Sequence, residues 1–136
     1  MDVRKELESL RFRHVGAICP EKFGRGCRVD LNPEVPGYAI WILVAEGEIK
    51  MVGATGRKNA TLKKRMQGCV STINAILIRR LYLDSTEPFK RLAPKVIAGG
   101  GEIHVWAREA TADTLGREKE TLNDRYNPEW WAGRHG

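Results

Sequence analysis

The sequence predicts an α/β (α+β) domain in which helices flank a small central antiparallel sheet of three strands. Residues 38–53 form two apolar segments around a short turn, and residues 102–108 alternate between apolar and polar side chains as a third strand does. Apolar residues recur at helical spacing over 60–67, 70–83 and 111–126. The chain has 136 residues, which suits a fold built around one core.

The hairpin is the clearest local prediction. Its first strand runs from Tyr38 to Ala45 and its second from Ile49 to Gly53. Glu46-Gly47-Glu48 forms the turn, where Gly47 is free to adopt a positive φ. Both strands are apolar on both faces over much of their length, which predicts that helices cover the sheet.

The first 36 residues are expected to form an arm. We predict a short polar helix at 2–10, a strand at 12–18 and a long loop at 19–37, because the last segment is dense in proline and glycine. The chain is therefore divided into an arm over 1–36 and a main domain over 37–136.

The helical segments carry start and stop signals. Residues 60–67 and 70–83 are expected as two separate helices. The next helix begins near Pro88, and Pro94 is expected to bend or end it. Asn127-Pro128 ends the last helix.

Composition narrows the classes of partner. The chain carries 23 basic and 17 acidic side chains, a net charge of +6, which favours polyanions: nucleic acid first and an acidic membrane surface second. The longest apolar run, Tyr38–Ala45, is far short of the ~20 residues that a membrane-spanning helix needs. The first residues, Met1–Glu6, are charged with both signs and are not expected to be a secretory signal.

Cysteine usage favours a reducing, cytoplasmic setting. The three cysteines are an odd number and form no CxxC pair, so neither a disulfide framework nor a structural zinc site is expected.

One acidic residue stands out in the last helix. Leu115, Leu122 and Tyr126 fall on one stripe, and Glu118 lies about 60° around the helix from Leu115. Placing a carboxylate at the margin of a buried face costs free energy unless the carboxylate pairs with a cation or binds a metal. The alternative is a boundary glutamate that pairs with an arginine.

The order of hairpin, basic helix, further helices, third strand, acidic helix and Asn-Pro-x-Trp resembles the GIY-YIG nuclease superfamily. The chain is most similar to the small single-domain phage endonuclease II type and to the GIY-YIG restriction enzymes, over roughly residues 37–131. The matching segments are Gly37-Tyr38-Ala39-Ile40, Met51-Val52-Gly53 with Thr55, the helix that carries Arg65, and Glu118 counted back from Asn127-Pro128-Glu129-Trp130.

Three positions depart from the family pattern. Met51 stands where the second motif has its tyrosine, Ala54 where relatives often carry lysine, and Trp131 where they often have asparagine. A methionine neither handles protons nor binds phosphate well. This departure keeps open a catalytically degenerate DNA-binding module on the same scaffold.

The resemblance implies a DNA endonuclease that hydrolyses phosphodiester bonds with one divalent metal ion, Mg²⁺ or Mn²⁺. It implies Glu118 as the single protein ligand of the metal, which suits a mostly hydrated Mg²⁺ site. It also implies that Arg65 donates to the scissile phosphate and that Tyr38 accepts the proton of the attacking water. Tyr38 as a core strand residue and Arg65 as a solvated charge are the structural alternatives.

The implied partner is double-stranded DNA. One site cuts one strand, so we expect a homo-oligomer, a dimer or a tetramer. A basic adaptor that binds RNA is the alternative from another functional class. His104, on the third strand, is an outside candidate for proton transfer. The expected DNA-binding residues are Thr55, Arg57, Lys58, Lys63, Lys64 and Asn127.

Overall fold

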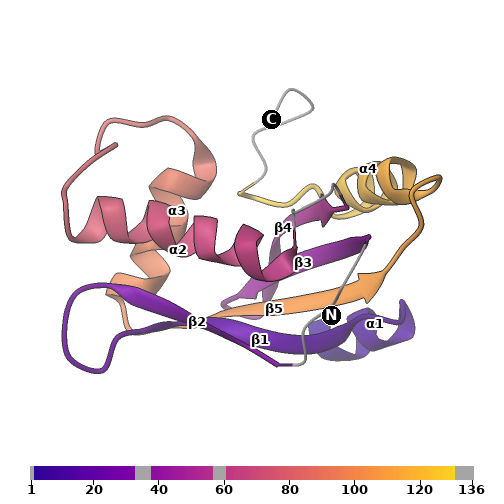
Figure 1. The fold of residues 1–136 in the computed structure, drawn as a ribbon, viewed down its shortest axis with the longest axis horizontal. Coiled ribbons are helices and arrows are strands. Elements are labelled where there is room, and N and C mark those ends of the chain that lie inside the picture. Colours follow the sequence, from indigo (N-terminus) through magenta and orange to yellow (C-terminus); the bar gives the residue numbers. More distant parts are fainter. Residues whose placement is uncertain (1, 33–37, 57–60, 131–136) are drawn as a thin grey trace.

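A computed structural model describes residues 2–32, 38–56 and 61–130 of the chain (Figure 1). The strands form one antiparallel sheet of five strands in the order β2-β1-β5-β3-β4. In chain order, the elements are α1 (Val3–Ser9), β1 (Arg13–Pro20), β2 (Cys27–Leu31), β3 (Ala39–Ala45), β4 (Glu48–Thr55), α2 (Leu62–Leu77), α3 (Pro88–Ala98), β5 (Ile103–Glu109) and α4 (Leu115–Tyr126).

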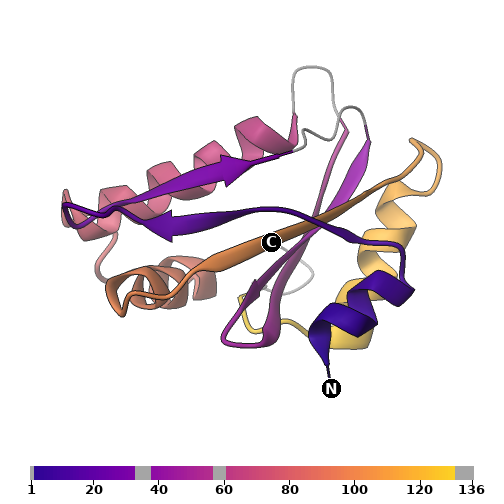
Figure 2. The same cartoon turned by 90° about the horizontal axis from the view of Figure 1, so that it is seen from below.

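Helices cover both faces of the sheet, as the apolar hairpin predicted. Figure 2 shows α2 and α3 on one side of the strands and α1 and α4 on the other. Alternate residues of β3 serve the two layers: Trp41 packs in the α2/α3 core and Ile40 in the α1/α4 core. All seven residues of β3 are buried, because both of its faces are covered.

The sheet has five strands, so the prediction of three was too low. β1, which pairs with β5, confirms the strand expected at 12–18, whereas β2, which pairs with β1, lies within the expected loop at 19–37. Asn74 of α2 fastens β2, because its amide accepts from the Cys27 N–H at 2.7 Å and donates to the Cys27 carbonyl at 3.1 Å. The expected boundary between residues 36 and 37 lies outside the described residues.

The hairpin is confirmed, with a second strand that begins at Glu48 and extends to Thr55, beyond the expected bounds. β3 and β4 are joined by Glu46 and Gly47, whose φ values of 56° and 73° are both positive. Two positive φ values define the turn type that suits the twist of a two-residue hairpin. The predicted N-terminal helix and third sheet strand are confirmed as α1 and β5.

The helices differ from two expectations. Residues 62–77 form one helix, α2, where two were expected, because Gly68 lies on an open surface and the ladder continues through it. The helix ends at Leu77, so the expected helical stretch to residue 83 was too long. Pro94 does not end α3, which continues to Ala98 with Pro94 buried inside it. The last helix does end at Asn127, which takes a left-handed conformation with φ 43°.

The segment after α4 crosses the edge of the sheet. The Trp130 N–H donates to the Lys50 carbonyl of β4 at 2.8 Å, and the Trp130 ring, 2% exposed, packs edge-on to Phe89 of α3. This crossing covers the β4 edge and links the two helical layers. No helix in the described ranges is long and apolar enough to cross a membrane.

Candidate active site

Three strand ends meet at one end of the sheet. Ala39, the first residue of β3, pairs with Thr55 at the end of β4 and with Glu109 at the end of β5. The chain leaves β5 there and turns into α4, at the right of Figure 1. The first motif and the acidic helix, far apart in sequence, therefore come to the same end of the molecule.

Tyr38 is held at this end by backbone and ring contacts. Its carbonyl accepts from the Ala110 N–H at 2.9 Å. Its ring lies directly against Gly56, where an added Cβ would come within 2.0 Å of Tyr38 Cδ1 and 3.0 Å of Leu115 Cδ2. Only glycine at position 56 allows this packing, and the Tyr38 side chain remains 41% exposed. Tyr38 is thus fixed beside the first turn of α4 and in contact with solvent.

Glu118 lies one turn along α4 from Leu115. Its Oε2 accepts from the Thr114 hydroxyl at 2.8 Å and its Oε1 from Arg108 Nη2 at 3.0 Å. The Glu118 side chain is 32% exposed, at the margin of the buried face as the helical stripe predicted. The arginine partner named as the structural alternative is therefore present.

Arg108 is the main residue of the site that the sequence did not reveal. It lies on β5, donates from Nη1 to the Leu10 carbonyl at 2.6 Å, and stacks its guanidinium over Phe12 at 4.6 Å. The sequence carries no signal for this pair, because Arg108 and Glu118 come together only when α4 packs back against the sheet. The pair lines a pocket of about 520 Å³ together with Arg11, Arg13, Ala107 and Glu109.

Arg65 lies on the α2/α3 face of the sheet, opposite the face that α4 covers. Its guanidinium lies 5.7 Å above the ring of Trp41, which faces the α2/α3 core. Tyr38 instead packs on the α4 side of the sheet. Described residues that line the Glu118 pocket include neither Tyr38 nor Arg65. A substrate that contacts Glu118 and Arg65 together must therefore pass around the end of the sheet.

Arg65 also lies near a buried thiol. Burial raises the pKa of the Cys69 thiol, and the positive charge of Arg65, one turn earlier in α2, opposes that rise only in part. Cys69 is therefore an unreactive core residue at neutral pH.

The predicted DNA-binding residues fall into three groups. Lys63 and Lys64 are exposed in the first turn of α2. Thr55 is buried, and its hydroxyl finds no partner among the described residues, so it does not offer a surface contact. Asn127 is the left-handed cap of α4, which accounts for an asparagine at this position without DNA. Arg57 and Lys58 lie outside the described residues.

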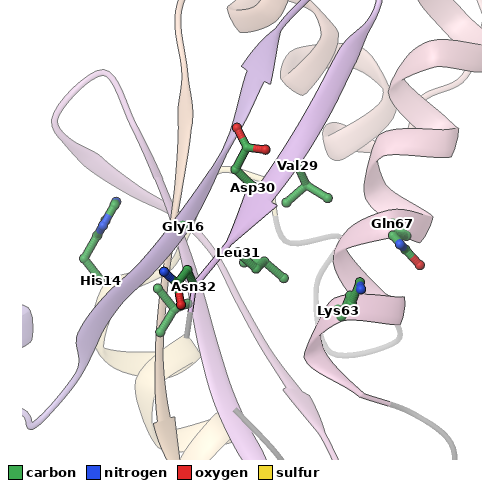
Figure 3. Close-up of a pocket in the computed structure, with 9 residues that line it drawn as sticks. His14, Gly16, Val29, Asp30, Leu31, Asn32, Lys63 and Gln67 are labelled. Carbon is green, nitrogen blue, oxygen red and sulfur yellow. The ribbon is translucent and has the colours of Figure 1, made fainter. Parts of the chain in front are cut away.

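Lys63 borders a second groove, shown in Figure 3. This groove of about 490 Å³ runs between α2 and β2, with Lys63 and Gln67 on the helix across from Val29 and Leu31 of the strand. It extends the exposed surface at the start of α2 toward the edge of the sheet.

His104, the outside candidate, lies away from Glu118. Its Nδ1 is 2.9 Å from His14 Nε2 on the neighbouring strand. Burial lowers the pKa of His14, and the nearby charges of His104 and Arg4 lower it further, against a smaller opposite effect of Glu102. The two histidines form a pair on the α1 side of the sheet, and no role was predicted for His14.

The described residues contain no cluster of three histidine, cysteine, aspartate or glutamate side chains arranged to hold a metal ion. The Glu118 carboxylate accepts a hydrogen bond from the Thr114 hydroxyl, and Glu109 is a second carboxylate that lines the same pocket.

The fold that carries this site is similar to the folds of two solved nucleases, in agreement with the nuclease fold that the motifs predicted. A bacteriophage T4 EndoII mutant has the same fold over 96% of this chain and 99% of its own, with a TM-score of 0.71 at 16% identity. The restriction endonuclease HPY188I, solved in complex with product DNA, aligns over 100% of this chain and 87% of its own, with a TM-score of 0.53 at 11% identity. The sequence matches no family model and no curated protein sequence.

Proposed function

We propose that the chain is a DNA endonuclease that hydrolyses phosphodiester bonds with one divalent metal ion at Glu118. The observation that carries the proposal is the position of Glu118: a half-buried carboxylate on the wall of an arginine-lined pocket, at the sheet end where Tyr38 is fixed. A pocket lined by two glutamates, Glu109 and Glu118, and by several arginines suits a phosphodiester and a cation together. The nuclease fold supports this assignment.

The oxygen donors fit Mg²⁺. This ion keeps several water ligands and commonly takes only one or two carboxylates from the protein. Among the described residues, the one partner of Glu118 Oε2 is the rotatable Thr114 hydroxyl, which can turn away and leave that oxygen to the metal. When bound, Mg²⁺ or Mn²⁺ would supply Lewis acidity and neutralise charge on the phosphate.

The remaining steps belong to side chains of the chain itself. Tyr38 accepts a proton from the attacking water, since its ring is fixed while its edge stays exposed. Arg65 donates to the phosphate oxygens from the α2 side. Arg108 is a positioning residue, because it orients the Glu118 carboxylate through Oε1.

A DNA-binding module that does not cut is the second candidate. Met51 packs against the α2/α3 core, so the second motif offers no proton-handling group. Both carboxylate oxygens of Glu118 already accept hydrogen bonds. A salt-dependent gel shift without cleavage would favour this candidate.

Incubation of the purified chain with supercoiled plasmid in Mg²⁺ or in EDTA separates the two functions. The endonuclease relaxes or linearises the plasmid in Mg²⁺ only. Unchanged plasmid under both conditions, with a retained gel shift, would exclude the endonuclease and leave the binding module. A preference for RNA in the same gel shift would favour the adaptor.

We further propose that the active form is a homo-oligomer on duplex DNA. Exposed apolar side chains at the α2–α3 connection, Ile78, Tyr82 and Leu83, support a subunit contact there. Sedimentation of the chain as a dimer or tetramer would support the proposal, and a monomer at micromolar concentration would count against it.

A further inference from the structure

The pocket beside Glu118 has arginines that no motif explains. Arg11 comes from the turn between α1 and β1, Arg13 from β1, and Arg108 from β5. Three guanidinium groups from three segments thus line one cavity of about 520 Å³, with Glu118 and Glu109 as its acidic residues.

The charges of this pocket are only partly balanced. Arg108 pairs with Glu118 at 3.0 Å. Within the described ranges, neither Arg11 nor Arg13 has a carboxylate at ion-pair distance. Two planar cations facing one cavity without an acidic partner are suited to an anion with several oxygens.

Arg11 is also held in an unfavourable backbone conformation. Its φ is 67°, its N–H donates to the Glu8 carbonyl at 3.0 Å, and the next N–H, of Phe12, donates to Leu7 at 2.9 Å. This left-handed position after a helix is where glycine is preferred, since a Cβ is strained there. Replacing Arg11 by glycine therefore removes the guanidinium group and relieves the backbone strain at the same time.

We propose that Arg11 and Arg13 bind a backbone phosphate of the DNA strand adjacent to the phosphate that is cut. The inference rests on the proposed function, because the scissile phosphate is taken to lie beside Glu118. The arginine side of the pocket then faces the neighbouring phosphate and fixes the strand in register. Duplex DNA is favoured over a free anion, because the cavity opens onto the end of the sheet that a strand must pass around to reach Arg65.

The experiment compares Arg11→Gly with Arg80→Gly. Arg80 provides a matched control: it is exposed, has a φ of 59°, and lies at the far end of α2 beside Leu77 and Ile97. Both changes remove one charge and relieve one left-handed residue. Binding of a fluorescent duplex is followed by anisotropy in EDTA over a series of salt concentrations, and the melting temperature of each variant is recorded.

Arg11→Gly is expected to weaken duplex binding roughly tenfold at 0.1 M salt and to lower the salt slope by about one, because one phosphate contact is lost. Its melting temperature should not fall. Arg13→Gln should weaken binding similarly, and Arg80→Gly should leave it near the wild-type value.

Equal effects of Arg11→Gly and Arg80→Gly, or none from Arg11→Gly, would overturn the phosphate site. If the wild-type chain still cleaves the plasmid in that case, the proposed endonuclease function is not contradicted. A wild-type chain that neither binds nor cuts DNA would overturn the proposed function and the phosphate site together.

Discussion

Arg108 ties Glu118 to the start of the chain: its Nη2 lies 3.0 Å from Glu118 Oε1, and its Nη1 lies 2.6 Å from the Leu10 carbonyl oxygen. The guanidinium plane, stacked over Phe12, can hold both acceptors at once because its donors form a rigid fork. One oxygen of Glu118 is thereby fixed, while the other accepts from the Thr114 hydroxyl.

Arg108→Lys should weaken this arrangement, because an ammonium group does not present two parallel donors. We expect a tenfold to hundredfold loss of plasmid cleavage and a rise in the Mg²⁺ concentration needed for half-maximal rate. The free energy of unfolding should fall by about 1–2 kcal/mol. Arg125→Lys, which alters the Arg125–Glu6 pair at 2.7 Å, is the control. An unchanged Mg²⁺ dependence would show that Arg108 does not position Glu118.

Gly56→Ala should displace the Tyr38 ring, since the new Cβ would lie 2.0 Å from Tyr38 Cδ1. We expect cleavage to fall about as far as in Tyr38→Phe, with a loss of about 1–3 kcal/mol in stability from overpacking. Initial nicking rates and urea unfolding measure the two effects. Wild-type nicking by Gly56→Ala would mean that the orientation of Tyr38 does not matter.

Gly68→Ala should stabilise the chain by about 0.5–1 kcal/mol, because alanine is favoured in a continuous helix and a Cβ there meets nothing within 4 Å. Urea denaturation measures the change. Destabilisation would contradict a single helix over Leu62–Leu77 and favour the two segments expected from the sequence.

The elements that sequence predicted well are those with local signals. The β3–β4 hairpin combines long apolar strands with a glycine turn, and α4 ends at an Asn-Pro pair. β2 was missed because glycines and prolines surround it, although Cys27–Leu31 alternates in the period of a strand. Those glycines form the turn before β2 and do not interrupt the strand.

The candidate site could be predicted from the sequence only in part, for a different reason. Tyr38 and Glu118 follow from motif order and a helical stripe, but Arg108 reaches Glu118 only through tertiary packing. The strained φ of Arg11 is equally invisible in the sequence, since it depends on how α1 turns into β1. Contacts between distant segments carry no local signal.

His14 should make stability depend on pH. Its pKa is lowered below 6.5 by burial and then by His104 and Arg4, with Glu102 opposing. The unfolded chain therefore takes up this proton near pH 6.5, and the folded chain only at lower pH. The contribution to stability is complete above pH 6.5 and is lost as the pH falls below it.

Urea unfolding at pH 7.5 and pH 5.5 tests this linkage. The wild-type chain should lose more stability between these values than His14→Gln, which has no imidazole to protonate at position 14. Equal losses in the two proteins would mean that burial of His14 does not resist protonation.

The central claim is that Glu118 is the carboxylate on which DNA cleavage depends. The most direct measurement is the initial rate of plasmid nicking in Mg²⁺ for Glu118→Gln beside Glu120→Gln, an exposed carboxylate two residues along the same helix. We predict that Glu118→Gln lowers the rate by at least about a hundredfold while Glu120→Gln stays near wild type. Equal nicking by wild type and Glu118→Gln, with both proteins folded, would contradict the account.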